Sequence, residues 1–181
     1  MRHGVGEPTP RGIWHVGADV DTDALAPGAY MQHGIDVVAQ HCLETLLPNF
    51  AREVKAGEVI VAGPNFGIGS SREQAAQALV HLGVAAVIAP SYSGLFFRNA
   101  FNVGLLLLTC PDAVKLKSES LVRIDLAALQ LVLPDGSRLS CEPIPGFLLA
   151  MAQAGGLVAM LRKRLNATRQ DPAKPSPPTH F

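Results

Sequence analysis

A serine pair and an arginine stand between a glycine-rich turn and a pattern typical of a helix. The stretch reads NFGIGSSRE, so Gly67 and Gly69 come just before Ser70, Ser71 and Arg72. Free backbone N–H groups and the positive end of the dipole make a helix start a binding site for an anion. The guanidinium of Arg72 can hold a carboxylate with two hydrogen bonds, and positive surroundings favour the charged form of a serine hydroxyl. The spacing therefore predicts carboxylate binding beside a serine that can be activated.

Other chemistries of glycine turns do not fit this stretch. A phosphate-binding P-loop has Gly-Lys followed by Ser or Thr, whereas Gly69 is followed by Ser70. A dinucleotide-binding turn would have a glycine at the position of Arg72. A hydrolase elbow has a glycine two residues after its serine, and neither Ser70 nor Ser71 is followed by one in this way. Without an elbow or triad spacing, a free-standing serine hydrolase is disfavoured.

A purely structural interpretation competes with the anion site. Ser70 and Glu73 have the S-x-x-E spacing of a capping box, in which each side chain satisfies a backbone N–H of the first helical turn. This interpretation accounts for Ser70 and Glu73 together. It does not account for the two glycines or for Ser71 and Arg72, so both interpretations stay open on spacing alone.

Buried strands and a helix must position this stretch. The apolar runs 58–62 and 84–89 have the length of buried strands, and the helical pattern between them spans about 71–82. Such a strand–helix–strand unit is expected to be right-handed with parallel strands. A second helix is expected to end at Gly104, followed by the apolar strand 105–109.

The N-terminal part supplies an acidic turn. A short strand over 13–16 leads into the segment DVDTD at 19–23, where Asp19 and Asp21 are expected to be turn residues rather than ligands. A loop containing Pro27 and Gly28 follows. A helix is then expected over 36–47, stopped by a proline.

The C-terminal part has a different pattern. Residues 121–141 contain short runs split by Asp135-Gly136, which is typical of antiparallel strands, and a last helix is expected after Pro145. We expect a flexible leader over 1–12, one folded domain over 13–165, and a proline-rich disordered tail over 166–181.

Composition limits the class of partner. The chain has 15 basic and 15 acidic residues and no block of either sign, which argues against nucleic acid and against an anionic membrane surface. The N-terminus lacks the apolar segment of a secretory signal, and the longest late apolar stretch is broken and short for a membrane span, so we expect a cytoplasmic protein. The three cysteines and six histidines show no metal-ligand spacing, so no metal is expected on this chain.

Three segments together resemble a known family. NFGIGSSRE at 65–73, DVDTD at 19–23 and LFFRNAFNVGLLL at 95–107 closely resemble the small subunits of 3-isopropylmalate dehydratases, which are equivalent to the swivelling C-terminal domain of aconitases. The resemblance runs from about Ile13 to Leu165. It implies an α/β swivel fold, with a mixed and largely parallel sheet flanked by helices and an additional antiparallel β segment.

The resemblance also implies a function and a partner. It implies a hydro-lyase that isomerises 2-isopropylmalate and 3-isopropylmalate by dehydration and rehydration in leucine biosynthesis. A separate large subunit would carry a [4Fe-4S] cluster, with none bound by this chain, and the two would form a heterodimer or heterotetramer that acts on a small hydroxy-acid.

Residue roles follow from the resemblance, position by position. Ser70 matches the general base, Asp23 an acidic residue near the leaving hydroxyl, and Ser71 and Arg72 groups that bind substrate carboxylates. The loop at Tyr30, Met31 and Gln32 is where such enzymes distinguish substrates.

One position departs from the family pattern. Ala29 stands where relatives commonly carry a basic residue that binds a carboxylate, so that contact is either lost or supplied by Arg98 or by the large subunit. The departure keeps open a sister enzyme acting on citramalate, dimethylmalate or homoaconitate. A swivel module without catalysis, serving as a binding partner, is a third possibility. With no firm cation at Met31 and Gln32, a small apolar substituent fits better than a second carboxylate.

Overall fold

The computed structural model describes residues 9–170, and the side chains of residues 9–167, of this 181-residue chain. It contains one seven-stranded sheet in the order β4-β3-β2-β1-β5-β6-β7. The predicted leader and tail lie mostly outside the described residues. Strand β1 begins at Arg11, and the last helix continues to Gln170, beyond the predicted domain limit of 165.

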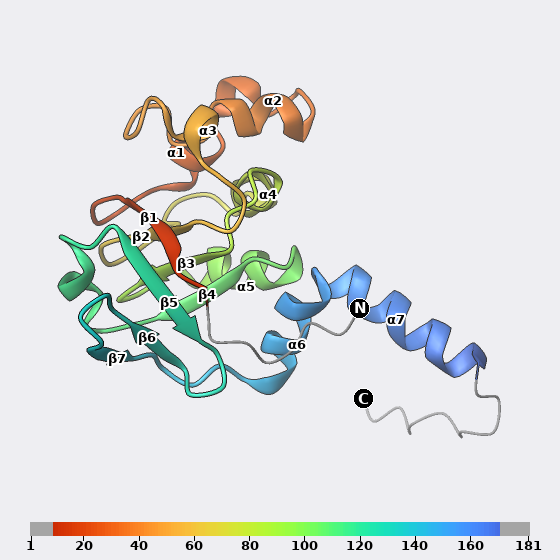
Figure 1. Cartoon of the computed structure of the whole chain (residues 1–181). Helices are drawn as coiled ribbons and strands as arrows, with labels where there is room; N and C mark the ends of the chain where they lie inside the picture. Colours follow the sequence, from red (N-terminus) through yellow and green to blue (C-terminus); the bar gives the residue numbers. More distant parts are fainter. Residues whose placement is uncertain (1–8, 171–181) are drawn as a thin grey trace.

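Four parallel strands form one half of the sheet (Figure 1). The second and third strands are buried along their whole length, which accounts for their continuous apolar sequences. The predicted strand–helix–strand unit with parallel strands is confirmed, because Val59–Val61 pairs in parallel with Ala86–Ala89. The four strands are β1 (Arg11–His15), β2 (Val59–Val61), β3 (Ala86–Ala89) and β4 (Leu106–Thr109).

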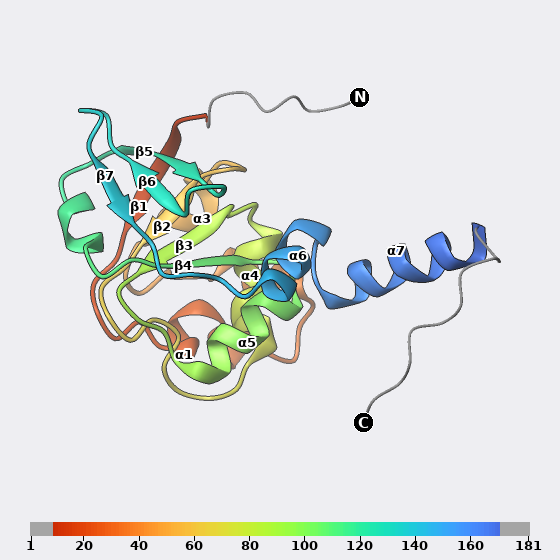
Figure 2. The ribbon, with the colours of Figure 1, turned by 90° about the horizontal axis from the view of Figure 1, so that it is seen from below.

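Helices in the three crossovers pack on one another beside these strands. α2 contacts α4, α4 contacts α5, and α1 also contacts α4. Figure 2 shows α1 and α5 on the same side of the parallel strands. The crossover elements are α1 (Thr22–Leu25), the 3-10 helix η1 (Gly28–Tyr30), α2 (Ile35–Gln40), α3 (Phe50–Glu53), α4 (Glu73–His81) and α5 (Gly94–Asn102).

The other half of the sheet is antiparallel, as the short runs split by Asp135-Gly136 predict. β1 joins the halves, because it pairs in parallel with β2 and antiparallel with β5. The turn at Asp135-Gly136 links two strands, and Gly136 adopts φ +85° there. The strands of this half are β5 (Leu121–Asp125), β6 (Gln130–Val132) and β7 (Arg138–Ser140), preceded by the 3-10 helix η2 (Ala113–Leu116). The two helices that follow, α6 (Gly146–Ala154) and α7 (Leu157–Gln170), both contact α5.

The sheet curls until its two edge strands, β4 and β7, come together. The backbone N–H of Glu142, just after β7, donates to the carbonyl of Thr109, the last residue of β4, at 2.8 Å. β4 and β7 are the two edges of the strand order. Figure 2 shows the chain passing from β7 by β4 on its way to α6. The hydrogen bond therefore joins opposite edges of one sheet.

The mixed sheet flanked by helices agrees with the predicted fold, and the differences lie in short elements. The helix expected over 36–47 ends at Gln40 and continues as turns, and the helix expected from Ser71 begins at Glu73. α7 extends away from the sheet in both views. Within residues 9–170, no helix combines the length and the apolar character that crossing a membrane requires.

Candidate active site

Three loops meet at the carboxyl ends of the parallel strands. The loop after β2 lies between the loops after β1 and β3 and is bonded to both. The N–H of Gly67 donates to the carbonyl of Val20 at 2.7 Å, and the N–H of Phe66 donates to the carbonyl of Ser91 at 3.1 Å. The N–H of Thr22 donates to the carbonyl of Ile68 at 2.8 Å. Ligands of open α/β sheets bind at this edge, and the predicted site residues lie in these loops.

The two glycines are needed for packing between the loops. Gly67 has φ +80°, and a Cβ there would lie 2.2 Å from the ring of Phe96 on α5. Gly69 has φ +104°, and a Cβ there would lie 3.1 Å from the hydroxyl of Thr22. Both positions therefore favour glycine, first for its backbone conformation and then for space. The two glycines that a capping box does not explain thus pack closely against the chain's own side chains.

The capping-box interpretation of Ser70 is wrong. α4 begins at Glu73, and its N-cap is Arg72, which has extended backbone angles and no side-chain capping bond. Ser70 lies too far before the helix to cap it. Its carbonyl instead accepts the N–H of Arg72 at 2.8 Å. Ser70 and Ser71 are both exposed, and within the described residues neither hydroxyl has a hydrogen-bond partner.

Arg72 and Asp23 form an ion pair across the two loops. Arg72 Nη1 donates to Asp23 Oδ1 at 2.6 Å and to the carbonyl of Ala26 at 2.9 Å. The same carboxylate oxygen accepts the N–H of Gly28 at 3.0 Å. Counting contacts with described residues only, Arg72 Nη2 and Asp23 Oδ2 are both left open. One edge of the guanidinium is fixed by protein groups, and the other can receive a carboxylate.

The ion pair keeps Asp23 ionised. The hydrogen bond from Arg72, and then the one from the N–H of Gly28, hold the pKa of the Asp23 carboxyl below its ordinary value. In the free chain Asp23 is therefore an anion that orients Arg72 rather than a proton donor.

The other two aspartates of the acidic segment have structural roles, as predicted. Asp21 accepts the N–H of Ala24 at 2.7 Å and thereby caps α1. Asp19 adopts φ +56° and accepts Asn65 Nδ2 at 2.9 Å. Asn65, with φ +62°, was not singled out from the sequence, although an asparagine after a buried strand is a common sign of a left-handed turn.

The loop after the acidic segment is held by an aromatic stack. The Tyr30 ring lies 3.6 Å from the His41 ring at an angle of 7°, and His41 Nδ1 pairs with Glu44 Oε2 at 2.6 Å. Met31 packs against the core, whereas Gln32 is exposed. Tyr30 is thereby fixed on the residue that follows α2, a contact that no local sequence pattern indicates.

The turn that contains Ala29 lies beside the ion pair. Ala29 is exposed in η1, and a Cβ on the adjacent Gly28 would lie 3.4 Å from Asp23 Oδ1 and 3.9 Å from Arg72 Nη2. Arg98, the proposed substitute for the missing basic residue, is exposed on α5. The cation that already lies next to this turn is Arg72.

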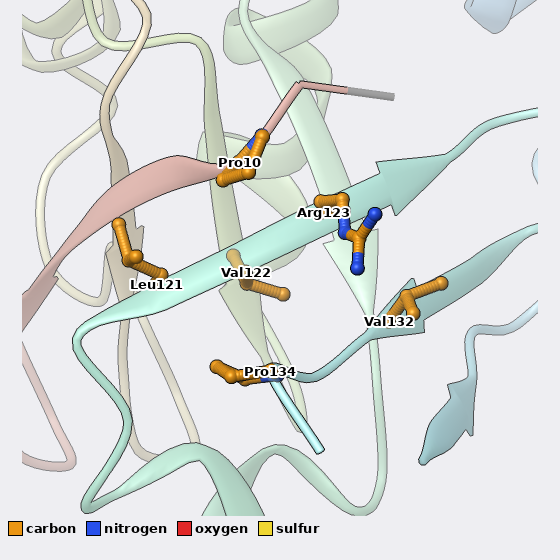
Figure 3. Close-up of a pocket in the computed structure, with 6 residues that line it drawn as sticks. All are labelled: Pro10, Leu121, Val122, Arg123, Val132 and Pro134. Atoms are coloured by element: carbon orange, nitrogen blue, oxygen red, sulfur yellow. The ribbon is translucent and has the colours of Figure 1, made fainter. Parts of the chain in front are cut away.

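Surface hollows lie both on the antiparallel half and beside these loops. A cavity of about 210 Å³ on the antiparallel half is shown in Figure 3; apart from Arg123, it offers only apolar side chains. A second cavity, of about 300 Å³, includes Asp23 in its wall together with the rest of the acidic segment and Leu46. We place the site on the loops because the ionised side chains of Arg72 and Asp23 meet there, next in sequence to the exposed hydroxyls of Ser70 and Ser71. Over residues 9–170, His, Cys, Asp and Glu side chains do not gather in any group of three that could hold a metal ion.

Comparisons with known proteins agree with this geometry. Residues 25–113 match the Aconitase C-terminal domain family. A 3-isopropylmalate dehydratase small subunit of Halothermothrix orenii is 41% identical over 81% of this chain and 90% of its own length. A methanogen homoaconitase small subunit of Methanocaldococcus jannaschii is 43% identical over 82% of this chain and 88% of its own length.

A solved structure has the same fold. The crystal structure of a 3-isopropylmalate dehydratase from Methanocaldococcus jannaschii superposes with a TM-score of 0.80, at 39% identity, and covers 89% of this chain and 97% of that one. The resemblance inferred from the sequence is thus confirmed. On this fold, these loops and these identities, the chain belongs to the aconitase C-terminal domain family, among the small subunits of the 3-isopropylmalate dehydratase type.

Proposed function

We propose that this chain is the small subunit of a hydro-lyase that interconverts 2-isopropylmalate and 3-isopropylmalate, a step of leucine biosynthesis, together with a separate large subunit. The observation that carries the proposal is the meeting of Asp23 with Arg72 beside the free hydroxyls of Ser70 and Ser71. Relatives named as 3-isopropylmalate dehydratase small subunits support it.

Arg72 is suited to bind a substrate carboxylate. Its Nη1 is held by Asp23 and Ala26, so the guanidinium is oriented before a ligand arrives. Orientation in advance lowers the entropic cost of binding. A carboxylate at the open edge of the guanidinium would lie next to the start of α4, where the helix dipole is favourable.

Ser70 is the candidate base, and Ser71 a candidate carboxylate ligand. Both hydroxyls are exposed and are not used in capping α4, so they are available to a ligand. A serine needs a strong local positive field to lose its proton. Arg72 and the helix start supply part of that field, and a ligand bound between the subunits would exclude water and strengthen it.

Asp23 contributes as an anion with one open oxygen. Its Oδ1 is occupied by Arg72 and the N–H of Gly28, whereas Oδ2 faces no described partner. We propose that Oδ2 accepts a hydrogen bond from the substrate hydroxyl. Tyr30, Met31 and Gln32 would contact the substrate's variable substituent from the loop fixed by His41.

The large subunit would carry the [4Fe-4S] cluster, which when bound supplies a Lewis acid for the leaving hydroxyl. The groups of this chain would then hold the carboxylate and move the proton. The assembly would be a heterodimer or heterotetramer in the cytoplasm.

A homoaconitate enzyme is the second candidate. Two methanogen homoaconitase small subunits are 43% identical to this chain, as similar as the dehydratase relatives. Met31 and Gln32 offer no cation for the additional carboxylate of such a substrate, which favours an apolar substituent. The small side chain of Ala29, in the turn beside Arg72, is compatible with either substituent.

The test is reconstitution with the large subunit from the same cells. The two chains are co-purified without oxygen, and the complex is assayed on isopropylmalate, citramalate, dimethylmalate and homoaconitate. Turnover of isopropylmalate with the highest kcat/KM supports the proposal, and preference for homoaconitate supports the second candidate. A stable complex that turns over none of the four substrates would support the third possibility, a binding module without catalysis.

A further inference from the structure

Two cysteines lie where the edges of the curled sheet meet. Cys110 follows Thr109 at the end of β4, and Cys141 precedes Glu142 after β7. The hydrogen bond from the N–H of Glu142 to the carbonyl of Thr109, 2.8 Å long, places the two cysteines side by side. The two thiols lie close enough to shift each other's pKa. The cysteines are 31 positions apart in sequence, so the fold alone brings them together.

The backbone on both sides holds this pair in place. The N–H of Cys110 donates to the carbonyl of Ala89 at 2.9 Å, and the N–H of Cys141 donates to the carbonyl of Leu129 at 2.8 Å. Tyr92 packs next to both, and its hydroxyl lies within hydrogen-bond distance of the carbonyls of Val87 and Leu108, at 2.8 and 2.9 Å, and can donate to either. Neither thiol is needed to satisfy these groups, so the sulfurs can react without loss of a backbone bond.

We propose that Cys110 and Cys141 form a two-electron redox site whose oxidised form is an intramolecular disulfide joining the two edges of the sheet. The oxidant is a low-molecular-weight disulfide. In a reducing compartment the dithiol is the resting form, and the disulfide forms as the ratio of oxidised to reduced small thiols rises.

The chemistry follows from which sulfur can be reached. Cys141 is partly exposed and Cys110 is fully buried, so the reagent meets Cys141 first. The Cys141 sulfur attacks one reagent sulfur and gives its proton to the departing reagent sulfur, which forms a mixed disulfide and releases one reagent thiol. The Cys110 thiolate then attacks the Cys141 sulfur and releases the second. Two electrons pass to the reagent, and the two cysteine protons end on its two thiols.

The environment prepares Cys110 for the second step. The hydrogen bond from the Cys141 thiol lowers the pKa of Cys110, and that of Cys141 is raised because it is the donor and is partly buried. The mixed disulfide removes this thiol donor, but the backbone hydrogen bond from Asp112 and the charge of Lys115, which also lower the pKa of Cys110, remain for the second step. Cys42 is a natural control, because it is fully buried, and burial raises the pKa of its thiol.

The test is peptide mapping of the full-length chain after oxidation. The native chain is treated with excess oxidised glutathione, alkylated during unfolding, cut with trypsin and analysed without reduction. Cleavage separates the cysteines, with Cys42 in 12–52, Cys110 in 99–115 and Cys141 in 139–162. We expect 99–115 linked to 139–162, reversal by dithiothreitol, and a Tm raised by roughly 5 °C or more because the link constrains the unfolded chain.

Variants sharpen the assignment. Cys42→Ser should keep the linked peptide, and Cys110→Ser and Cys141→Ser should each lose it. A glutathione adduct on Cys141 with Cys110 still free would overturn the proposal. So would a Cys141 link between two chains, or full alkylation of all three thiols after oxidation. The peptide map of the oxidised wild-type chain tests the proposal even if a serine variant fails to fold.

Discussion

Arg72 and Asp23, 49 residues apart in sequence, are joined by a hydrogen bond of 2.6 Å that leaves one side of each group open. Nη1 and Oδ1 are used by the protein, and Nη2 and Oδ2 face no partner among the described residues. The pair therefore links the acidic segment to the glycine turn while keeping a donor and an acceptor for a ligand. A substrate with a carboxylate next to a hydroxyl presents the complementary groups.

Replacing Arg72 with lysine tests the open guanidinium edge. Lysine keeps the charge and can still reach Asp23, but it cannot offer a second fixed nitrogen to a carboxylate. For Arg72→Lys in the complex with the large subunit, we expect KM to rise about 10- to 100-fold, with a smaller change in kcat. Steady-state kinetics measure both constants. Arg52→Lys, on exposed α3 and bonded to Asn49, is the matched control. Equal kinetics for the two variants would remove Arg72 from the site.

Ser70→Ala separates catalysis from folding. Because Ser70 does not cap α4, its removal should leave the Tm of the chain within about 1–2 °C of wild type, as for other exposed positions. Loss of a general base costs about 10²- to 10⁴-fold in kcat. Thermal unfolding, co-purification with the large subunit and turnover are measured in parallel, with the exposed Ser118→Ala as control. A large fall in Tm with activity falling in proportion would contradict the assignment.

Asp23→Asn tests the ion pair through pH. The pKa of Asp23 is lowered in the folded chain, so the carboxylate stabilises the fold at pH values above its unfolded pKa. That stabilisation is lost as pH falls through the folded pKa. We expect Asp23→Asn to have a lower Tm than wild type at pH 7, and the difference to close below about pH 4. A difference in Tm that stays constant from pH 7 to pH 3 would show that the charge of Asp23 does not contribute to stability.

Much of the parallel half could be predicted from local sequence, because buried strands leave continuous apolar runs at 58–62 and 84–89. The helix α1 could not be distinguished from a turn by its sequence, since four residues are too few to show a helical period. The start of α4 was placed too early because Ser70 and Glu73 imitate a capping box. No local sequence pattern shows that the two edges of the sheet, at the ends of β4 and β7, meet at Thr109 and Glu142. Ser70, Ser71 and Arg72 were singled out by their types and Asp23 by the family resemblance, but the bond between Arg72 and Asp23 depends on the pairing of β1 with β2, which brings their loops together.

Gly67→Ala tests the packing that holds the glycine turn against α5. Gly67 and Gly136 have nearly the same φ, +80° and +85°, so an alanine carries a similar conformational cost for its positive φ, about 1–2 kcal/mol, at either position. They differ in space, because the new Cβ would meet the Phe96 ring at 2.2 Å in one case and nothing within 4 Å in the other. Overpacking adds about 1–3 kcal/mol, so Gly67→Ala should lower the free energy of unfolding clearly more than Gly136→Ala. Denaturant unfolding of both variants measures the difference. Equal destabilisation would mean that Phe96 moves aside freely, and the turn that carries Ser70 and Arg72 would then not be fixed by α5.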